Sequence, residues 1–213
     1  MIEIKKFVVN PFQENSYLLY DETGEGVIID PGFYEPYEEL ELSTYISANK
    51  ITPVKLIYTH CHVDHILGNN FVFETYGLNP ELHKAGLPFL QKGHQQGKIY
   101  GFDMEPSKGE PSFIAHGDLV EFGNSALKAV YTPGHVDGSL CFIHDPQKFV
   151  ITGDVLFKDS IGRTDFPTGD FDLLMKSIHE QLFTLEDHFT VYCGHGPETS
   201  IGYEKVNNPF IRF

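Results

Sequence analysis

One short stretch constrains this chain more than any other. It is rich in metal-ligating side chains and runs Tyr58-Thr59-His60-Cys61-His62-Val63-Asp64-His65. The stretch places three imidazoles and one carboxylate within six positions. It follows an apolar run, Val54 to Tyr58, that is typical of a buried strand. Functional groups gather beyond the carboxyl ends of strands in α/β sheets, so this position indicates a site rather than a solvated polar loop.

The alternation of side chains divides the stretch into two half-sites. In an extended segment, residues two apart point the same way, so His60 and His62 are suited to bind one metal ion. Asp64 continues that alternation, but His65 is out of phase with it, as at the start of a helix. We expect Asp64 and His65 to bind a second ion nearby. Each half-site then needs ligands from elsewhere in the chain.

Three distant residues are candidates for those ligands. His135 follows a Thr-Pro-Gly turn, His195 lies between two glycines, and each comes shortly after a predicted strand. Asp154 also ends an apolar strand, where a carboxylate is costly unless it is paired or bound to a metal. Because a carboxylate has two oxygens, Asp154 is suited to bridge two cations.

Composition and charge exclude several classes of protein. With 213 residues, 41% of them hydrophobic, the chain is long enough to bury a large core as one domain, residues 1–213. Its 30 acidic residues outnumber 15 Lys and Arg, and a formal charge of −15 argues against nucleic acid as a partner. No apolar run is long enough to span a membrane, and the N-terminus does not resemble a signal peptide. We therefore expect a cytoplasmic protein without a membrane partner.

The cysteines do not indicate a disulfide framework. Cys61, Cys141 and Cys193 are odd in number and widely spaced, which favours a reducing compartment. Cys61 has a side-chain direction opposite to that of its histidine neighbours. We expect Cys61 and Cys193 to pack in the core.

The apolar patterns predict two halves with the same order of elements: strands, helix, strand, helix. In the first half, strands are expected at Ile2 to Val9, Ser16 to Tyr20, Gly26 to Ile29 and Val54 to Tyr58, and helices at Tyr37 to Asn49, His65 to Tyr76 and Leu87 to Gln96. In the second half, strands are expected at Leu119 to Phe122, Leu127 to Thr132, Leu140 to His144, Phe149 to Thr152 and Phe189 to Cys193, and helices at Asp170 to Leu182 and Tyr203 to Asn208. Asp170 is a predicted N-cap.

These motifs resemble the metallo-β-lactamase superfamily. The resemblance rests on Thr-His-Cys-His-Val-Asp-His at 59–65, Thr-Pro-Gly-His at 132–135, Gly-Asp at 153–154 and Gly-His-Gly-Pro at 194–197. The segments 153–167 and 195–199 are most similar to the hydroxyacylglutathione hydrolase (glyoxalase II) branch. This resemblance implies an α/β fold (α+β in some classifications). It would be a four-layer αβ/βα sandwich, with two central mixed β-sheets flanked by helices and the site at one rim.

The resemblance also implies a ligand set. The first metal would be bound by His60, His62 and His135, and the second by Asp64, His65 and His195, with Asp154 bridging the two. Two zinc ions are expected, although iron or manganese fit the same nitrogen and carboxylate ligands. Two ions about 3.5–4 Å apart would lower the pKa of a shared water toward ~7, giving a hydroxide that attacks a carbonyl. Asp64 and Asp154 would be catalytic together with this hydroxide.

The implied activity is that of a binuclear metallohydrolase, a thioesterase of the glyoxalase II type. A thiolate leaves without a strong acid, so a small-molecule thioester is the expected substrate class. Thr59 and Asp30 are expected either to orient ligand imidazoles or to serve only as capping and turn residues. Arg163 and Phe166 are expected to line the pocket and bind substrate, although Arg163 would equally pair with Asp165.

Other activities are left open at this point. A persulfide dioxygenase of the same superfamily shares Gly-Arg-Thr-Asp-Phe and uses a single iron, for which His60, His62 and Asp154 would suffice. The same hydroxide would attack a lactone or a β-lactam. A metal-stabilised binding scaffold is disfavoured, because structural zinc sites are usually closed by protein ligands.

The recognition of glutathione is not part of this expectation. Only residues 196–213 follow His195, which leaves no room for the C-terminal helical extension that helps full-length glyoxalase II bind glutathione. The identity of the thioester and the oligomeric state are therefore not predicted.

Overall fold

The structure is a computed structural model that describes residues 1–211, so the last two residues of the expected 1–213 domain lie outside it. Its first six-stranded sheet has the order β1 (Glu3–Val9), β2 (Glu14–Tyr20), β3 (Glu25–Ile29), β4 (Thr52–Ile57), β5 (Pro80–Leu82) and β6 (Ser112–Phe113). The second has the order β14 (Thr199–Ser200), β13 (Thr190–Cys193), β10 (Phe149–Gly153), β9 (Leu140–His144), β8 (Ser125–Tyr131) and β7 (Leu119–Phe122). A small two-stranded sheet pairs β11 (Leu156–Phe157) with β12 (Ser160–Ile161).

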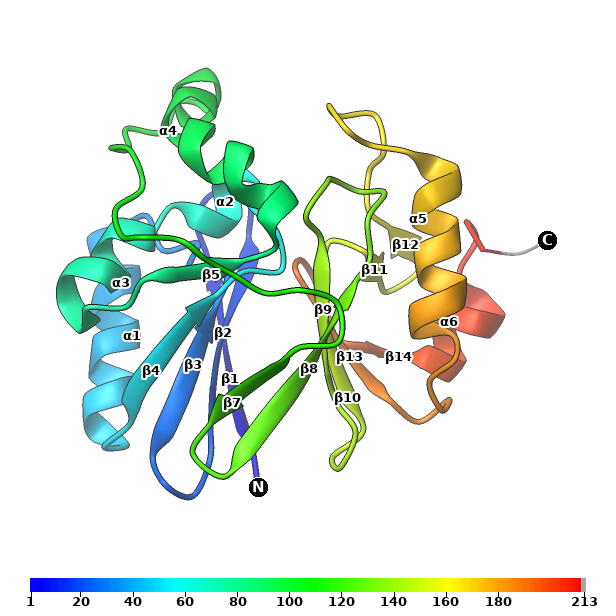
Figure 1. The fold of residues 1–213 in the computed structure, drawn as a ribbon, viewed down its shortest axis with the longest axis horizontal. Helices are drawn as coiled ribbons and strands as arrows, with labels where there is room; N and C mark the ends of the chain where they lie inside the picture. The colour runs from blue at the N-terminus through cyan, green and yellow to red at the C-terminus, as the bar shows by residue number, and fades with distance from the viewer. Residues whose placement is uncertain (212–213) are drawn as a thin grey trace.

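Helices cover the outer faces of the two large sheets, as Figure 1 shows. The first sheet is covered by α1 (Pro36–Ala48), α2 (Val63–Ile66), α3 (Asn69–Tyr76), the 3-10 turn η1 (Lys84–Gly86) and α4 (Leu87–Tyr100). The second is covered by α5 (Phe171–Ser177), its π-helical continuation η2 (Ile178–Leu182) and α6 (Ile201–Asn207). The expected αβ/βα arrangement of four layers around two mixed sheets is confirmed.

Alternating side chains explain why the sheets pack on both faces. In β2, Leu18 contacts the helices, whereas its neighbour Leu19 faces the second sheet. In β10, Val150 contacts the helices on its side and Ile151 faces the first sheet. All four side chains are fully buried. The core therefore has three main parts, one between the sheets and one under each layer of helices, with a small fourth cluster around Val63, Leu67 and Phe102.

The strand directions bring several chain segments to one edge. β10 and β13 are parallel neighbours, and β8 runs in the same direction because β8 and β10 are both antiparallel to β9. The carboxyl ends of β8, β10 and β13 therefore lie at the same edge of the second sheet. These are the ends that precede the candidate residues His135, Asp154 and His195.

In the first half, two predicted helices differ from the observed ones. The helix expected from His65 to Tyr76 is divided into α2 and α3, with Gly68 between them. The helix expected from Leu87 to Gln96 continues to Tyr100 and ends at Gly101, which has the left-handed backbone conformation of a helix C-terminus. The extra turn of α4 places more side chains over the candidate site.

In the second half the predicted N-cap of α5 is confirmed. The side chain of Asp170 accepts a hydrogen bond from Leu173 N at 2.9 Å. The predicted helix from Tyr203 begins earlier, at Ile201, because Ser200 caps it. The short strands β5, β6, β11, β12 and β14 were not expected from the sequence. Each has two or three residues, too few for an alternating pattern to be recognised.

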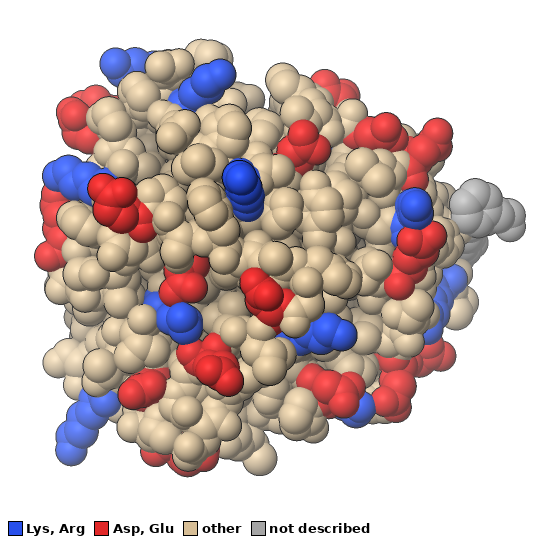
Figure 2. Space-filling model, in the orientation of Figure 1, with Lys and Arg blue, Asp and Glu red and all other residues tan. Residues whose placement is uncertain are grey.

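No helix within residues 1–211 is both long and apolar enough to cross a membrane. On the face drawn in Figure 2, Lys and Arg are scattered singly or beside Asp and Glu rather than gathered in a patch.

Candidate metal centre

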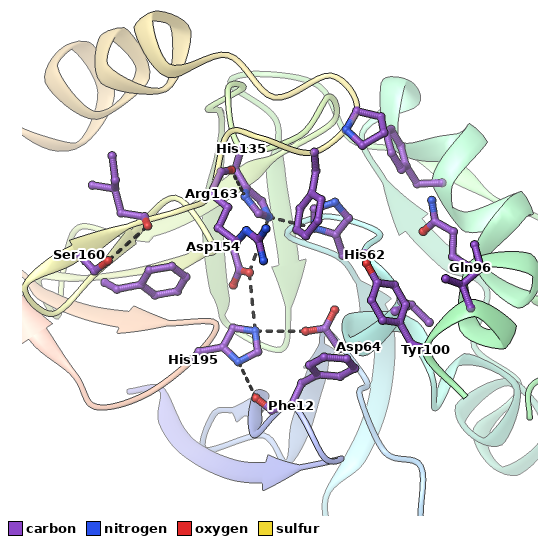
Figure 3. A pocket seen from close by; sticks show the side chains of 17 residues that line it. Phe12, His62, Asp64, Gln96, Tyr100, His135, Asp154, Ser160, Arg163 and His195 are labelled. Carbon is purple, nitrogen blue, oxygen red and sulfur yellow. Dashed lines mark hydrogen bonds and ion pairs between the residues drawn. The ribbon is translucent and has the colours of Figure 1, made fainter. Parts of the chain in front are cut away.

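The structure brings all seven predicted ligands together at one edge of the sandwich. Among the described residues, two groups hold their ligand atoms within 4.8 Å of one another in a way that matches the two predicted half-sites: His60, His62 and His135, and Asp64, His65 and His195. Asp154 lies between them. Figure 3 shows five of the seven around one cavity, with side chains from both halves of the fold pointing into it.

The first group consists of three imidazoles. His62 Nδ1 lies 3.1 Å from His60 Nε2 and 2.9 Å from His135 Nε2. Zinc bound tetrahedrally at Zn–N distances of about 2.0–2.1 Å holds its nitrogens roughly 3.3 Å apart. The three nitrogens therefore converge at a spacing close to that of ligands around one ion.

The second group joins one carboxylate to two imidazoles. Asp64 Oδ2 lies 3.2 Å from His195 Nε2 and 3.8 Å from His65 Nε2. His65 is completely buried, whereas His195 is partly open to the cavity. One carboxylate and two imidazoles form a mixed oxygen and nitrogen site of the kind that zinc, iron and manganese accept.

Asp154 contacts both groups. Its Oδ1 lies 3.5 Å from His65 Nε2, and its Oδ2 lies 3.6 Å from His195 Nε2, 3.7 Å from His135 Nε2 and 4.0 Å from His60 Nε2. The residue that follows β13 must be small, because a Cβ on Gly194 would lie 2.2 Å from Asp154 Oδ1. The position of this carboxylate suits the predicted bridging role.

The local backbone explains the order of ligands in the histidine-rich stretch. His62 is extended, with φ −65° and ψ 154°, and occupies the position just before α2 without a capping hydrogen bond from its side chain. The helix already begins at Val63, so the expectation that Asp64 continues the alternation of an extended strand is wrong. Asp64 and His65 project instead from the first turn of α2, which separates them from His60 and His62.

Hydrogen bonds from outside the two groups orient the imidazoles. Asp30 Oδ2 lies 3.1 Å from His65 Nδ1, and Thr59 Oγ1 lies 3.1 Å from His60 Nδ1. Asp30 also accepts from the backbone N–H of Thr59 at 2.7 Å, which ties the end of β3 to the end of β4. Each contact occupies Nδ1 and leaves Nε2 facing the site. Of the two roles left open for Thr59 and Asp30, the structure has the contacts that orient imidazoles.

Two backbone carbonyls orient the other imidazoles in the same way. His135 Nδ1 donates to the carbonyl of Arg163 at 2.7 Å, and His195 Nδ1 donates to the carbonyl of Phe12 at 3.1 Å. His62 differs, because its Nδ1 is the atom that faces the other ligands. Four histidines therefore present Nε2 and one presents Nδ1.

Burial and charge set the protonation of the site. Burial lowers the pKa of His60 well below its ordinary value, and burial together with the neighbouring His135 lowers that of His62 to about 3. These histidines are neutral at pH 7, the form that binds a metal. Burial opposes ionisation of Asp154, but His65, His60 and His195 together outweigh burial and hold the pKa of Asp154 well below the usual range.

Two buried atoms show that a cation fits this arrangement. His65 Nε2 and Asp154 Oδ1 have no hydrogen-bond partner, although both are inaccessible to solvent. A buried polar atom without a partner costs free energy, so such atoms are rare unless an ion or water satisfies them. Both atoms point toward the ligand groups described above. The residues present therefore fit divalent cations, with nitrogen and carboxylate ligands already converged.

Glu14 was missed from the sequence. Its side chain is fully buried, Oε2 accepts from Ser16 Oγ at 2.8 Å, and Oε1 lies 3.6 Å from His65 Nδ1. Burial raises the pKa of Glu14 well above its ordinary value. The sequence feature that could have indicated Glu14 is the polar triplet Glu14-Asn15-Ser16 at the start of an otherwise apolar strand.

The ligands open into a cavity of about 580 Å³. Arg163 and Phe166 both line it, as expected. The guanidinium of Arg163 also makes the predicted pair with Asp165, donating from Nε at 2.9 Å and from Nη2 at 2.7 Å. Cys61 is buried against the helix-facing core rather than open to the cavity, and burial raises the pKa of its thiol well above the ordinary value.

A two-sheet sandwich with histidines and aspartates gathered at the strand ends defines the class of protein: an α/β protein with a candidate metal centre at one rim. The model of the metallo-beta-lactamase superfamily matches residues 9–195. The chain belongs to that superfamily, a superfamily of metallo-hydrolases.

Two curated relatives match along nearly their whole length. The chain is 34% identical to the probable metallo-hydrolase YqgX of Bacillus subtilis over 209 residues, covering 97% of this chain and 96% of the relative. It is 33% identical to the hydroxyacylglutathione hydrolase GloC of Haemophilus influenzae over 221 residues, covering 99% and 98%.

Two solved structures are similar over the whole fold. One is BLEG-1, a B3 metallo-beta-lactamase, with 31% identity, a TM-score of 0.86 and coverage of 99% of this chain and 100% of that one. The other is TTHA1623 in a di-iron-bound form, with 30% identity, a TM-score of 0.87 and coverage of 97% and 99%.

Proposed function

We propose that this protein is a binuclear metal-dependent thioesterase of the glyoxalase II type. The observation that carries the proposal is the position of Asp154, whose carboxylate lies within 4.0 Å of imidazoles from both ligand groups. One carboxylate shared between two complete groups of three ligands is the arrangement of a two-metal site. A di-iron form of a structural neighbour supports two ions.

The residues of the centre would have distinct tasks. His60, His62 and His135 would hold one ion, and Asp64, His65 and His195 the other, with Asp154 between them. We infer zinc as the metal, because imidazole and carboxylate ligands suit it, although iron or manganese fit the same ligands. When bound, two such cations supply Lewis acidity and a nucleophilic hydroxide at neutral pH.

The protein scaffold would keep this centre preorganised. Asp30 and Thr59 hold the rings of His65 and His60, so their Nε2 atoms do not have to reorient during turnover. The partly open side of Asp64 and His195 faces the cavity, where a substrate carbonyl has access to the centre. A thioester is the proposed substrate class, because a thiolate leaves without protonation by a strong acid. The relative named hydroxyacylglutathione hydrolase supports this class.

One assay combined with metal analysis tests the proposal. Protein purified without added metal should contain about two metal ions per chain and hydrolyse S-lactoylglutathione or a simpler thioester. A single iron per chain, with oxygen uptake in the presence of glutathione persulfide and no thioester hydrolysis, would replace the thioesterase by a persulfide dioxygenase. Two ions per chain without thioester hydrolysis would overturn the substrate class while keeping the binuclear centre.

Hydrolysis of a β-lactam or lactone is the second candidate function. The similarity to the B3 metallo-beta-lactamase BLEG-1 favours it, because the two chains share their fold and 31% of their residues over 99% of this chain. Nitrocefin should be included in the same assay. A kcat/KM for nitrocefin above that for every thioester tested would make the lactam ring the better substrate.

A further inference from the structure

The wall of the cavity is strongly apolar once the candidate metal ligands are set aside. Of the 12 remaining lining residues, 9 are apolar or aromatic, and the polar ones are Gln96, Ser160 and Arg163. Five are aromatic: Phe12, Phe89, Tyr100, Phe157 and Phe166. A cavity with apolar walls and few polar groups selects ligands by apolar area.

The aromatic rings surround the candidate centre on several sides. Phe89 and Phe166 lie edge-on to His62, with ring centroids 6.1 Å and 5.8 Å from it. Phe157 lies edge-on to His195 at 6.2 Å. A substrate that brings its carbonyl to these ligands must therefore place neighbouring atoms against aromatic carbon.

The rim keeps large apolar side chains in solvent. Ile99 is 81% exposed, Tyr100 51% and Phe12 43%, and the rings of Phe12 and Tyr100 contact each other at 5.7 Å. Phe12 and Tyr100 line the same cavity as the candidate ligand Asp64 (Figure 3). Apolar groups exposed at the mouth of a cavity indicate a surface that a ligand covers.

Positive charge for binding an anionic ligand is scarce. Arg163 is the single Lys or Arg among the described lining residues. Its Nε and Nη2 already donate hydrogen bonds to Asp165. Its guanidinium also lies over the ring of Phe166, 4.1 Å from the centroid. With a formal charge of −15, the protein as a whole repels anions. A glutathione carrier brings a pair of carboxylates, for which a site normally supplies free Arg or Lys.

We propose that, given the thioesterase activity proposed above, this site takes thioesters with an uncharged apolar acyl group and does not depend on a glutathione carrier. The acyl group covers the aromatic wall formed by Phe12, Phe89, Tyr100, Phe157 and Phe166. Each added methylene of the acyl group raises kcat/KM by about fourfold, until the wall is covered.

The test compares matched substrates with the metal-loaded protein. Thioesters of N-acetylcysteamine, a neutral thiol, are assayed from acetyl to hexanoyl, together with hexanoylglutathione. We expect kcat/KM to rise with acyl length and hexanoylglutathione to be no better than hexanoyl-N-acetylcysteamine. A kcat/KM independent of acyl length, or a preference of about tenfold or more for the glutathione carrier, would overturn the inference.

Variants of the wall separate packing from other effects. Tyr100→Ser and Phe166→Ser should each lower the ratio of hexanoyl to acetyl kcat/KM by about tenfold, whereas Tyr100→Phe should preserve it. Leu40→Ser is the matched control, because Leu40 is a 65% exposed apolar residue on α1 outside the cavity. An unchanged ratio in both serine variants would exclude the aromatic wall as the acyl site.

Binding without hydrolysis distinguishes this inference from the proposed function. Calorimetric titration uses two non-hydrolysable thioethers, S-hexyl-N-acetylcysteamine and S-hexylglutathione. Tighter binding of the neutral thioether than of S-hexylglutathione, together with weaker binding in Tyr100→Ser, supports the apolar site. This result supports it even if no thioester is hydrolysed. In that case the proposed thioesterase activity is rejected and the apolar binding site is kept. Tighter binding of S-hexylglutathione overturns the apolar specificity, whatever the activity.

Discussion

Asp154 lies between two groups of imidazoles and is the residue on which the proposed chemistry depends most. Burial opposes its ionised form, but the neighbouring His65, His60 and His195 together outweigh burial and hold the pKa of Asp154 well below the usual range. Its Oδ1 lies near His65 of the second group, and its Oδ2 lies near His135 of the first group and His195 of the second. Removing the carboxylate leaves each group one ligand short.

Asp154→Ala should therefore affect both metal content and turnover. We expect thioester kcat/KM to fall by about 10³-fold or more, because the two ligand groups that would hold the cations lose the carboxylate that lies between them. Metal content, measured on the purified variant, should fall from about two ions to one or fewer per chain. Asp172→Ala is the control, since Asp172 is an exposed carboxylate in the first turn of α5. Near-normal turnover in Asp154→Ala would contradict the bridging role.

The elements that carry the ligands were recognisable because each ligand follows a strongly apolar run. The strands before His60 and Asp154 are long enough to show burial, so the ends of β4 and β10 were placed to within a residue or two. α4 was harder, since Gly93 and Gly97 interrupt its pattern. Both glycines pack closely there, because an added Cβ would lie 2.3 Å from Cδ1 of Ile66 at Gly93, or 2.9 Å from Sδ of Met104 at Gly97. The aromatic wall that α4 contributes was therefore not foreseen.

The loop between β8 and β9 has a backbone that requires glycine. Gly134 has φ +126°, and an added Cβ would lie 2.2 Å from the backbone N of Leu174 in α5. Gly134→Ala should therefore push the loop and His135 away from the site. We expect a loss of about 2–3 kcal/mol in the free energy of unfolding, measured with urea, and weaker metal binding.

Gly77→Ala is the control that separates backbone strain from a steric clash with α5. Gly77 also has positive φ, +70°, but no atom lies within 4 Å of an added Cβ. Its substitution should cost only the conformational strain, about 1–2 kcal/mol, and leave the metal content unchanged. Equal effects of the two substitutions on metal content would show that the contact with α5 does not position His135.

At the scale of the whole molecule, the two halves are joined at both ends of the sheets. Beside the site, Asn15 N donates to Gly194 O at 2.7 Å and Tyr17 Oη donates to Cys193 O at 2.7 Å, so β2 holds the loop that carries His195. At the opposite end, Asp21 Oδ2 accepts from Asn124 N at 2.7 Å. Contacts of this kind link residues more than a hundred positions apart. The sequence contains no local pattern for them, which is why Glu14 and Asn15 were not predicted.

Asp21→Asn tests the distal link. Burial raises the pKa of Asp21, but hydrogen bonds from Thr23, Asn124 and Ser125 outweigh it and lower the pKa from 3.8 to about 2. An amide nitrogen cannot accept the bonds made by Oδ2, so the variant should lose about 2 kcal/mol of stability at pH 7. Because the folded pKa lies below the unfolded value, this contribution is complete above about pH 4 and is lost as pH falls through about 2.

Urea unfolding at several pH values measures this difference. The difference in free energy of unfolding between wild type and Asp21→Asn should be constant from pH 7 to 5 and become smaller below about pH 4. Asp145→Asn is the control, because Asp145 is exposed and pairs with Lys148 on the surface, where such a pair contributes little. A gap that stays constant down to pH 3 would mean that the charge of Asp21 is not what stabilises the contact.

The candidate centre also links the halves, because its ligands come from both. Residues 60–65 belong to the first half, whereas His135, Asp154 and His195 belong to the second. Ions that bind the folded chain but not the unfolded chain therefore stabilise the sandwich. For one site, the free energy of unfolding rises by about 2.7 kcal/mol at a free metal concentration of 100 Kd. For a chain of this length that corresponds to roughly 5–10 °C in Tm.

Removing metal with a chelator should lower Tm by that amount, and adding zinc should restore it. Asp154→Ala should start from a lower Tm and show a smaller rise with zinc, since its carboxylate no longer joins the two groups. An identical Tm with and without metal would place the ions outside the seven residues that connect the halves.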